Sequence, residues 1–246
     1  MGVDNAVTRR VLVTGGSGDL GGAICVALAR AGWRVSVHAN AHRERAEAVA
    51  ARIRAEGGAA EVAVFDVTDA AATHAAIDAL LRVGAISAVV HNAGVHDDAP
   101  LAGMTEPQWR HVLAVSLDGF FHVVQPLLLP MARARFGRVV AVSSVAATLG
   151  NRGQVNYAAA KSALHGAARS LAREMASRNV TVNVVAPGII DGRLTRDAFS
   201  PERVQALVPA GRAGTPAEVA NVVAFLCSDA ASYVNGQVIG VNGGMG

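Results

Sequence analysis

Tyr157 and Lys161 stand four residues apart in a segment whose composition favours a helix, and Ser144 follows an apolar, strand-like run upstream. Four residues make about one helical turn, so the phenol and the ammonium would project from the same face. Because a nearby cation stabilises phenolate, we expect Lys161 to lower the pKa of Tyr157 from its usual value of about 10. These side chains together could donate a proton to a reacting oxygen.

The Tyr-x-x-x-Lys spacing alone more often marks an ordinary helix surface, so a second motif decides its meaning. Near the N-terminus, an apolar run ending at Thr14 leads through a glycine-rich turn at 15–22 into a helical pattern. A strand, a glycine-rich turn and a helix N-terminus together offer backbone N–H groups to a pyrophosphate. The turn therefore predicts a dinucleotide site.

With both motifs in place, the chain resembles the short-chain dehydrogenase/reductase family, and within it the 3-oxoacyl-[acyl-carrier-protein] reductase branch. The resemblance covers nearly the whole chain, and its landmarks are Thr14-Gly15, Asp66-Val67, Asn92-Ala93-Gly94, Ser143-Ser144, Tyr157 with Lys161, and Pro187-Gly188. It implies that hydride from a nicotinamide cofactor reduces a ketone while Tyr157 donates a proton, Ser144 binds the same oxygen and Lys161 holds the ribose. Ser144 is preferred to Ser143 because it stands 13 positions before Tyr157, as in the family motif.

Alternating strand and helix patterns supply a framework for these residues. Strands are expected near 10–14, 33–38, 60–65, 86–91, 137–143, 180–186 and 237–241, and helices near 20–31, 42–56, 69–82, 106–133, 155–177 and 215–228. This rhythm predicts an α/β Rossmann fold, a doubly wound seven-stranded parallel sheet flanked by helices, with ligands at the carboxyl ends of the strands. No linker interrupts it, so we expect a single domain over 1–246.

Composition excludes several classes of function. At 246 residues and 52% hydrophobic content the chain can bury a substantial core, and its net charge of +3 is too diffuse for a nucleic-acid partner. Cys25 and Cys227 lack metal-ligand spacing, so we expect reduced core thiols and no metal. Apolar stretches are interrupted before the ~20 residues of a membrane span, and 1–10 lacks a signal sequence, which predicts a cytoplasmic protein without a membrane partner.

The residue after the second strand discriminates between NAD and NADP in the family, where a carboxylate favours NAD. Here that position is Ala39, followed by Asn40, His42 and Arg43, so NADPH is expected, although His42 and Arg43 could instead begin a solvated helix. By resemblance, the other cofactor-binding residues are Gly15, Ser17, Gly18, Asp19, Leu20, Asp66, Val67, Asn92, Ala93, Gly94, Tyr157, Lys161, Pro187, Gly188 and Ile190.

Three positions depart from the family pattern. Asp19 replaces the second glycine of the Thr-Gly-x-x-x-Gly-x-Gly turn, and we expect its side chain to turn away and cap the following helix. Ser116 stands where the family has an asparagine that positions a water for proton relay to the lysine; a hydroxyl can still hold a water, so Ser116 is a further catalytic candidate. Gly192 replaces a threonine that would touch the cofactor.

The resemblance implies NADPH-dependent reduction of a 3-oxoacyl thioester, and the departures favour a specialised enzyme of polyene, polyketide or other carrier-bound synthesis over housekeeping fatty-acid synthesis. Residues 191–212 would form the substrate lid. Arg135 and Arg178 match basic positions that dock acyl carrier protein in the family. An equally good interpretation is that they are ordinary surface arginines exposed to solvent. Apolar faces on 106–133 and 155–177 fit a subunit contact, and the resemblance implies a homotetramer.

Two other functions stay open. The same catalytic residues would serve an alcohol, sugar or steroid dehydrogenase acting on a free small molecule. The three departures would also suit a non-catalytic dinucleotide-binding subunit, although the intact Ser144, Tyr157 and Lys161 argue against it.

Overall fold

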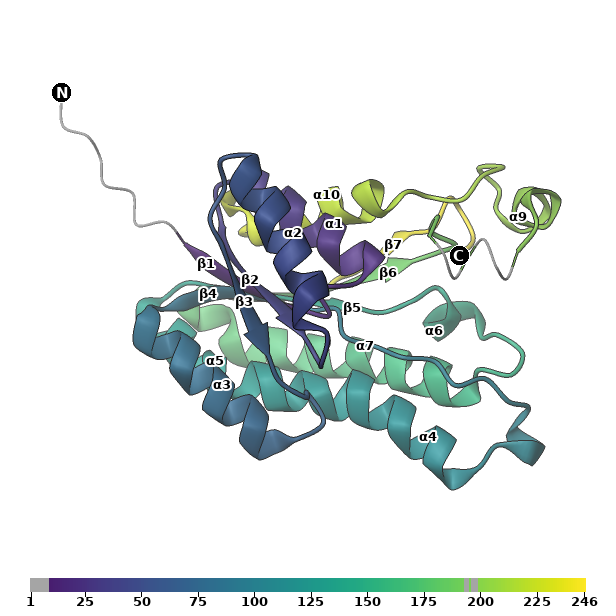
Figure 1. Ribbon diagram of the computed structural model, residues 1–246. Coiled ribbons are helices and arrows are strands. Elements are labelled where there is room, and N and C mark those ends of the chain that lie inside the picture. Colours follow the sequence, from purple (N-terminus) through teal and green to yellow (C-terminus); the bar gives the residue numbers. More distant parts are fainter. Residues whose placement is uncertain (1–8, 193–194, 196–198) are drawn as a thin grey trace.

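The computed structural model describes residues 9–192, 195 and 199–246, which form a parallel sheet of seven strands in the order β3-β2-β1-β4-β5-β6-β7 (Figure 1). The strands are β1 (Arg10–Thr14), β2 (Arg34–Ala39), β3 (Ala60–Val64), β4 (Ile86–His91), β5 (Gly137–Val142), β6 (Val180–Pro187) and β7 (Val238–Val241). The strand order reverses between β1 and β4. In sheets of this kind, ligands bind at that switch point, outside the carboxyl ends of the strands.

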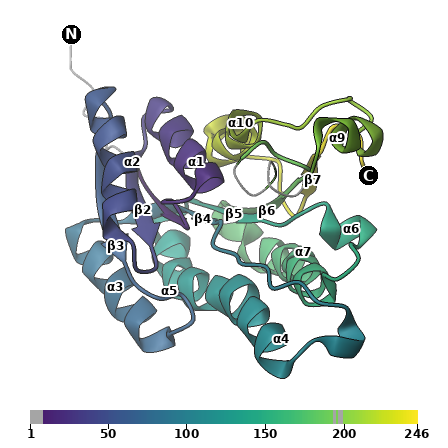
Figure 2. The same cartoon turned by 45° about the vertical axis from the view of Figure 1, so that its right-hand side comes forward.

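Helices cover both faces of the sheet (Figures 1 and 2). One layer contains α1 (Asp19–Arg30), α2 (Arg43–Ala55) and α10 (Pro216–Cys227), and the other contains α3 (Ala70–Val83), α5 (Gly119–Ala134) and α7 (Val155–Met175). Shorter helices at the carboxyl side are α4 (Glu106–Leu113), α6 (Ala146–Leu149) and α9 (Pro201–Leu207). The expected α/β fold and its elements are confirmed, whereas α6 and α9 were not foreseen.

The helix expected at 106–133 is divided by a π-turn, Ala114–Asp118, that joins α4 to α5. The combined segment, Glu106–Ala134, is long and apolar enough to span a membrane by length and composition, with 44% of its most apolar window buried. Asp118 and Gly119 interrupt its apolar run, as the sequence indicated, although the segment as a whole reaches this length. Because Leu127 and Val123 of this segment pack fully buried against the sheet, its apolar character is that of a core helix.

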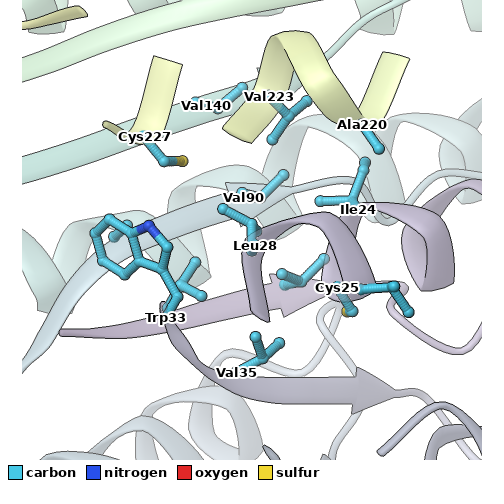
Figure 3. Packing of buried hydrophobic residues seen from close by; sticks show 14 of the residues in the cluster. Ile24, Cys25, Leu28, Trp33, Val35, Val90, Val140, Ala220, Val223 and Cys227 are labelled. Atoms are coloured by element: carbon cyan, nitrogen blue, oxygen red, sulfur yellow. The ribbon is translucent and has the colours of Figure 1, made fainter. Parts of the chain in front are cut away.

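A hydrophobic cluster lies on each face of the sheet. Figure 3 shows the first cluster, in which Ile24 and Leu28 of α1 lie near Val223 of α10. Cys25 and Cys227 belong to this cluster as buried free thiols, as the sequence predicted. Burial raises the pKa of the Cys227 thiol to about 12, so this sulfur stays protonated and serves as packing.

Candidate active site

β5 and α7 bring the three candidate catalytic side chains together. Ser144 follows β5, and Tyr157 and Lys161 occupy the first two turns of α7. Ser144 lies close enough to the Tyr157 phenol to influence its pKa, and Lys161 Nζ lies 5.8 Å from the centroid of the phenol ring. The neighbouring Ser143 points elsewhere, because its hydroxyl donates to the main-chain oxygen of Lys161 at 3.0 Å.

Burial dominates the pKa of Tyr157. Removal from water raises the pKa of the phenol, the hydrogen bond from Ser144 opposes that rise, and the Asp98 carboxylate adds to it. The expected lowering by Lys161 is therefore wrong: Nζ donates to the main-chain oxygen of Val142 at 2.8 Å. A phenol with a raised pKa stays protonated at neutral pH, as a proton donor must.

Lys161 is 3% exposed, and burial lowers the pKa of its ammonium to about 8. A Cβ atom placed on Gly94 would lie 2.9 Å from Lys161 Nζ and 3.6 Å from Ser116 Oγ. Lys161 Nζ and Ser116 Oγ therefore both lie next to the space that a side chain at position 94 would fill, and Gly94 leaves that space free. Ser116 is fully buried, and within the described part of the chain its Oγ has no hydrogen-bond partner, so this hydroxyl can bind a water or a ligand.

A cavity of about 670 Å³ opens at the carboxyl edge, at the switch point between β1 and β4. Twelve of the expected cofactor residues line it: Gly15, Ser17, Gly18, Asp19, Leu20, Asn40, Asp66, Val67, Asn92, Ala93, Gly94 and Ile190. Six others, His42, Arg43, Tyr157, Lys161, Pro187 and Gly188, are not part of its wall. Tyr157 and Lys161 lie beside the cavity, since Lys161 Nζ approaches Gly94.

Three further residues of the wall belong to segments that the sequence indicated, Gly21 to the glycine-rich turn and Asp191 and Thr195 to the expected lid, whereas five were not predicted as site residues: His38, Val95, His111, Val115 and Pro216. Arg45 also lines the cavity, whereas His42 lies 3.2 Å from the Glu44 carboxylate. The sequence could not separate Arg45 from its basic neighbours, because which side chain faces the cavity depends on where α2 begins. His38 carried no signal because it looks like an ordinary strand residue.

The glycine-rich turn has the geometry that a dinucleotide cradle requires. Gly15 has φ of +62°, a conformation that favours glycine, and a Cβ atom on Gly21 would lie 2.1 Å from the Gly15 oxygen. Asn92 Nδ2 holds the turn by donating to the main-chain oxygens of Thr14 and Gly15, at 3.1 and 3.2 Å. The backbone can therefore approach a pyrophosphate closely at the start of α1.

Asp19 does not cap α1. The N-cap is Gly18, which makes no side-chain capping bond, and Asp19 is the first residue of the helix. The helix begins one residue earlier than the sequence pattern indicated, which places this carboxylate in the first turn and in the cavity wall. Negative charge is favourable in a first helical turn, so the helix dipole stabilises Asp19 there. Gly192 also lines this part of the cavity.

Asp66, which the resemblance places at the adenine, has a fixed side chain. Its Oδ1 accepts from the Thr68 N–H and from the Thr68 hydroxyl, both at 2.8 Å. The fixed Asp66 carboxylate and the glycine-rich turn together fit a dinucleotide cofactor.

The lid expected at 191–212 includes α9, and its positions 193–194 and 196–198 lie outside the described residues. Near its start, the Asp191 N–H donates to the Gly214 oxygen at 2.7 Å. Near its end, the Ala210 N–H donates to the Gly243 oxygen at 3.0 Å. Both ends of the segment are thus anchored to neighbouring backbone.

Arg135 and Arg178 are both exposed and lie close together, since Arg135 Nη2 donates to the Ser177 oxygen at 3.2 Å. They precede β5 and β6, whose first residues pair as Gly137 with Val180. The two arginines therefore lie at the amino edge of the sheet, opposite the edge that carries the catalytic side chains.

A parallel sheet with a glycine-rich turn at its switch point and a Ser-Tyr-Lys group beside it defines a dinucleotide-binding oxidoreductase. A family model described as enoyl-(acyl carrier protein) reductase matches residues 17–246. The 3-oxoacyl-[acyl-carrier-protein] reductase FabG of Aggregatibacter actinomycetemcomitans is 43% identical over 241 residues, which cover 97% of this chain and 100% of that protein. The FabG of Escherichia coli (strain K12) is 40% identical over 237 residues, with coverage of 95% and 96%.

Among solved structures, the gluconate 5-dehydrogenase from Burkholderia cenocepacia J2315 in complex with NADP and tartrate has a TM-score of 0.90 and 35% identity, covering 96% of this chain and 94% of that one. The chain belongs to the short-chain dehydrogenase/reductase family. Within that family it is an oxidoreductase that resembles FabG.

Proposed function

We propose that the protein is an NADPH-dependent reductase that converts a carrier-bound 3-oxoacyl thioester into the 3-hydroxyacyl product, in fatty-acid, polyene or polyketide-type biosynthesis. The observation that carries the proposal is the grouping of Ser144, Tyr157 and Lys161 beside the cavity at the carboxyl edge. The substrate class is supported by 40–43% identity to reductases of this kind over nearly their full lengths. The proposed location is the cytoplasm.

Bound NADPH would supply a hydride to the ketone carbon. Ser144 lies near the Tyr157 phenol, so both hydroxyls would bind one carbonyl oxygen. As negative charge develops on that oxygen, Tyr157 donates its phenolic proton. Lys161 keeps a positive charge behind the phenol, and the open Ser116 hydroxyl can hold a water through which the proton is replaced.

The preference for NADPH over NADH is argued from the end of β2. Ala39 is the last residue of that strand, and no carboxylate stands at this position to bind ribose hydroxyls or repel a phosphate. Asn40 and Arg45 line the cavity just beyond it, and a guanidinium is a strong partner for a phosphate. A relative with 35% identity carries NADP in its solved structure, which also supports this choice.

Arg135 and Arg178 are the proposed docking surface for the acyl carrier protein, whose acidic character they would complement. Since they lie at the amino edge of the sheet, a carrier docked on one subunit would serve the active site of another. The proposed homotetramer allows this arrangement. Phe121 and Leu129, exposed by 60% and 66% on α5, are the apolar surface offered to a second copy.

The proposal is tested by NADPH oxidation with one 3-oxoacyl group presented on acyl carrier protein, on a small thioester and as a free ketone. We expect the highest kcat/KM with the carrier. NADP reduction with gluconate and no thioester turnover would instead indicate a sugar dehydrogenase, as in the Burkholderia relative. Tight NADPH binding without turnover of any substrate would indicate a non-catalytic dinucleotide-binding subunit.

A further inference from the structure

Two buried histidines lie at the carboxyl ends of the strands that flank β1. His38 of β2 is 1% exposed and His91 of β4 is fully buried, and neither takes part in the proton transfer described above. We propose that they are paired positioning residues: His38 fixes the adenosine side of the site, and His91 fixes its catalytic side. The proposal rests on the proposed function, because it divides that same site between the two side chains.

The hydrogen bonds of His38 determine its protonation. The Gly15 N–H donates to His38 Nδ1 at 3.0 Å, and since a backbone N–H can only donate, Nδ1 carries no proton. His38 Nε2 lies 2.8 Å from the Phe65 main-chain oxygen, which can only accept, so the proton is on Nε2. His38 is therefore a neutral imidazole in one tautomer. Its ring also packs on the Phe65 ring, with 4.1 Å between centroids.

These two bonds connect the segments that would receive the adenosine half of the cofactor. Gly15 begins the glycine-rich turn, and Phe65 immediately precedes Asp66. His38 also lines the cavity between them. Loss of the imidazole nitrogens would leave two buried backbone groups without partners, and the turn and Asp66 would no longer be held in fixed relative positions.

The bonds of His91 are equally definite. Thr14 Oγ1 accepts from the N–H groups of Asn92 and Ala93, both at 3.0 Å, which occupies its lone pairs. Its own proton is then directed to His91 Nδ1, 3.3 Å away. His91 Nε2 lies 3.1 Å from the main-chain oxygen of Ser116, so this nitrogen carries the proton. His91 is thus a second neutral imidazole in a single tautomer.

The bond to Ser116 connects His91 with the catalytic half of the site. Ser116 is the middle residue of the π-turn Ala114–Asp118, and its hydroxyl faces the space beside Gly94 and Lys161. By holding the Ser116 carbonyl, His91 sets the position of that hydroxyl. Burial and the charge of Lys161 lower the pKa of His91 to about 3, in accord with a neutral ring close to the lysine.

If the two histidines only stabilised the sheet, replacing either one would weaken cofactor binding, turnover and folding together. His38 is bonded only to the adenosine half of the site, whereas only His91 is bonded to Ser116. His91 is also bonded to Thr14, so the separation of cofactor affinity from turnover should be sharpest when the bond to Ser116 alone is removed. This separation is what a merely structural role would not produce.

The test uses His38→Phe and His91→Phe, which keep a ring of similar size and remove both hydrogen bonds. The NADPH dissociation constant is measured by fluorescence titration, and kcat at saturating NADPH with a 3-oxoacyl thioester. We expect His38→Phe to raise the dissociation constant on the order of tenfold with kcat within about twofold of wild type. We expect His91→Phe to lower kcat on the order of tenfold, and to weaken NADPH binding less than His38→Phe does, because it also removes the bond to Thr14. His91→Asn, which keeps the bond to Thr14, should lower kcat with the dissociation constant within about twofold of wild type.

Conservative variants check that the hydrogen bonds are responsible. His38→Asn retains an acceptor near Nδ1 and His91→Gln retains a donor near Nε2, so each should recover most of the loss. Thermal unfolding of every variant provides the folding control. Should a phenylalanine variant fail to fold, His38→Gln and His91→Asn, which remove only the bond to Gly15 or to Ser116, carry the comparison.

Parallel losses of affinity and turnover in both variants, or no loss in either, would overturn the assignment. Wild-type protein that binds NADPH but reduces no substrate would refute the proposed function instead. In that case the titration with His38→Phe still decides the cofactor half of the inference.

Discussion

Tyr157 and Lys161 illustrate how burial sets the chemistry of individual residues in this site. Burial raises the pKa of the phenol and lowers the pKa of the ammonium, to about 8 for Lys161. Both shifts favour the neutral form of the side chain. The raised pKa keeps Tyr157 protonated, as a proton donor to the substrate would have to be. The lowered pKa means that Lys161 begins to lose its positive charge near pH 8.

Replacement of Tyr157 by phenylalanine should abolish ketone reduction and leave NADPH affinity largely intact, because the change removes a proton donor that lies outside the cavity wall. The loss in kcat should be on the order of 10²-fold or more, as for general acid catalysis. Steady-state NADPH oxidation and fluorescence titration measure the two quantities. Turnover close to the wild-type rate would refute the role of Tyr157.

The pH dependence of turnover should reflect Lys161. Because the pKa of Lys161 is lowered to about 8, its positive charge is present below that pH and is lost as the pH rises through it. Tyr157, whose pKa is raised, stays protonated over the same range. We therefore expect kcat at saturating substrate to fall above about pH 8. A kcat that is constant up to about pH 10 would contradict this assignment of charge.

At the scale of elements, the end of β2 and the glycine-rich turn border the cavity that is proposed to hold the cofactor. Ala39 closes β2 and is 1% exposed, and Arg45 of α2 lines the cavity beyond it. The backbone geometry of the turn suits any dinucleotide, so the choice between NADPH and NADH depends on these side chains.

Ala39→Asp should reverse or erode the preference for NADPH, because it introduces a carboxylate next to Asn40 and near Arg45, where the 2′-phosphate is proposed to bind. Both cofactors are titrated against wild type and variant. Ala39→Ser is the matched control, since it adds a polar atom without charge and should retain the preference. Tighter binding of NADH by the wild-type protein would show that Asn40 and Arg45 do not select a phosphate.

Much of this framework could be predicted from the sequence, since the strands are apolar runs bounded by glycine or charge and the main helices have a clear period. The four residues of α6 are too few to show a period, and the π-turn Ala114–Asp118 leaves the apolar pattern of its helix nearly unchanged. The proximity of Tyr157 and Lys161 followed from their spacing, but the direction of the shift in the pKa of Tyr157 did not, because burial is a property of the whole fold. The role of Asp19 was mistaken because the exact start of α1 decides it.

At the scale of the whole molecule, the catalytic side chains and the proposed docking arginines lie at opposite edges of the sheet. The six residues of β5 separate the edges by about 20 Å, at about 3.3 Å per residue. Delivery of a carrier-bound chain would therefore depend on the arrangement of subunits. The proposed docking on Arg135 and Arg178 therefore depends on the proposed assembly of subunits through α5.

The double variant Arg135→Glu with Arg178→Glu should slow reduction of a carrier-bound substrate much more than reduction of the same acyl group on a small thioester. Charge reversal turns attraction to an acidic carrier into repulsion, and a small thioester needs no docking surface. The difference should shrink with added salt, which screens exposed charges over about 10 Å at 0.1 M. Equal slowing of both substrates would indicate a structural role for the arginines.

The central claim is that this protein transfers hydride from NADPH to the ketone carbon of a 3-oxoacyl thioester with Tyr157 as the proton donor. The most direct measurement is mass spectrometry of the 3-hydroxyacyl product formed from NADPH in which both hydrogens on nicotinamide C4 are deuterium, with wild type and Tyr157→Phe in parallel. We predict deuterium on the hydroxyl-bearing carbon with wild type and almost no product with the variant. Product without deuterium, or equal labelling by both proteins, would contradict the claim.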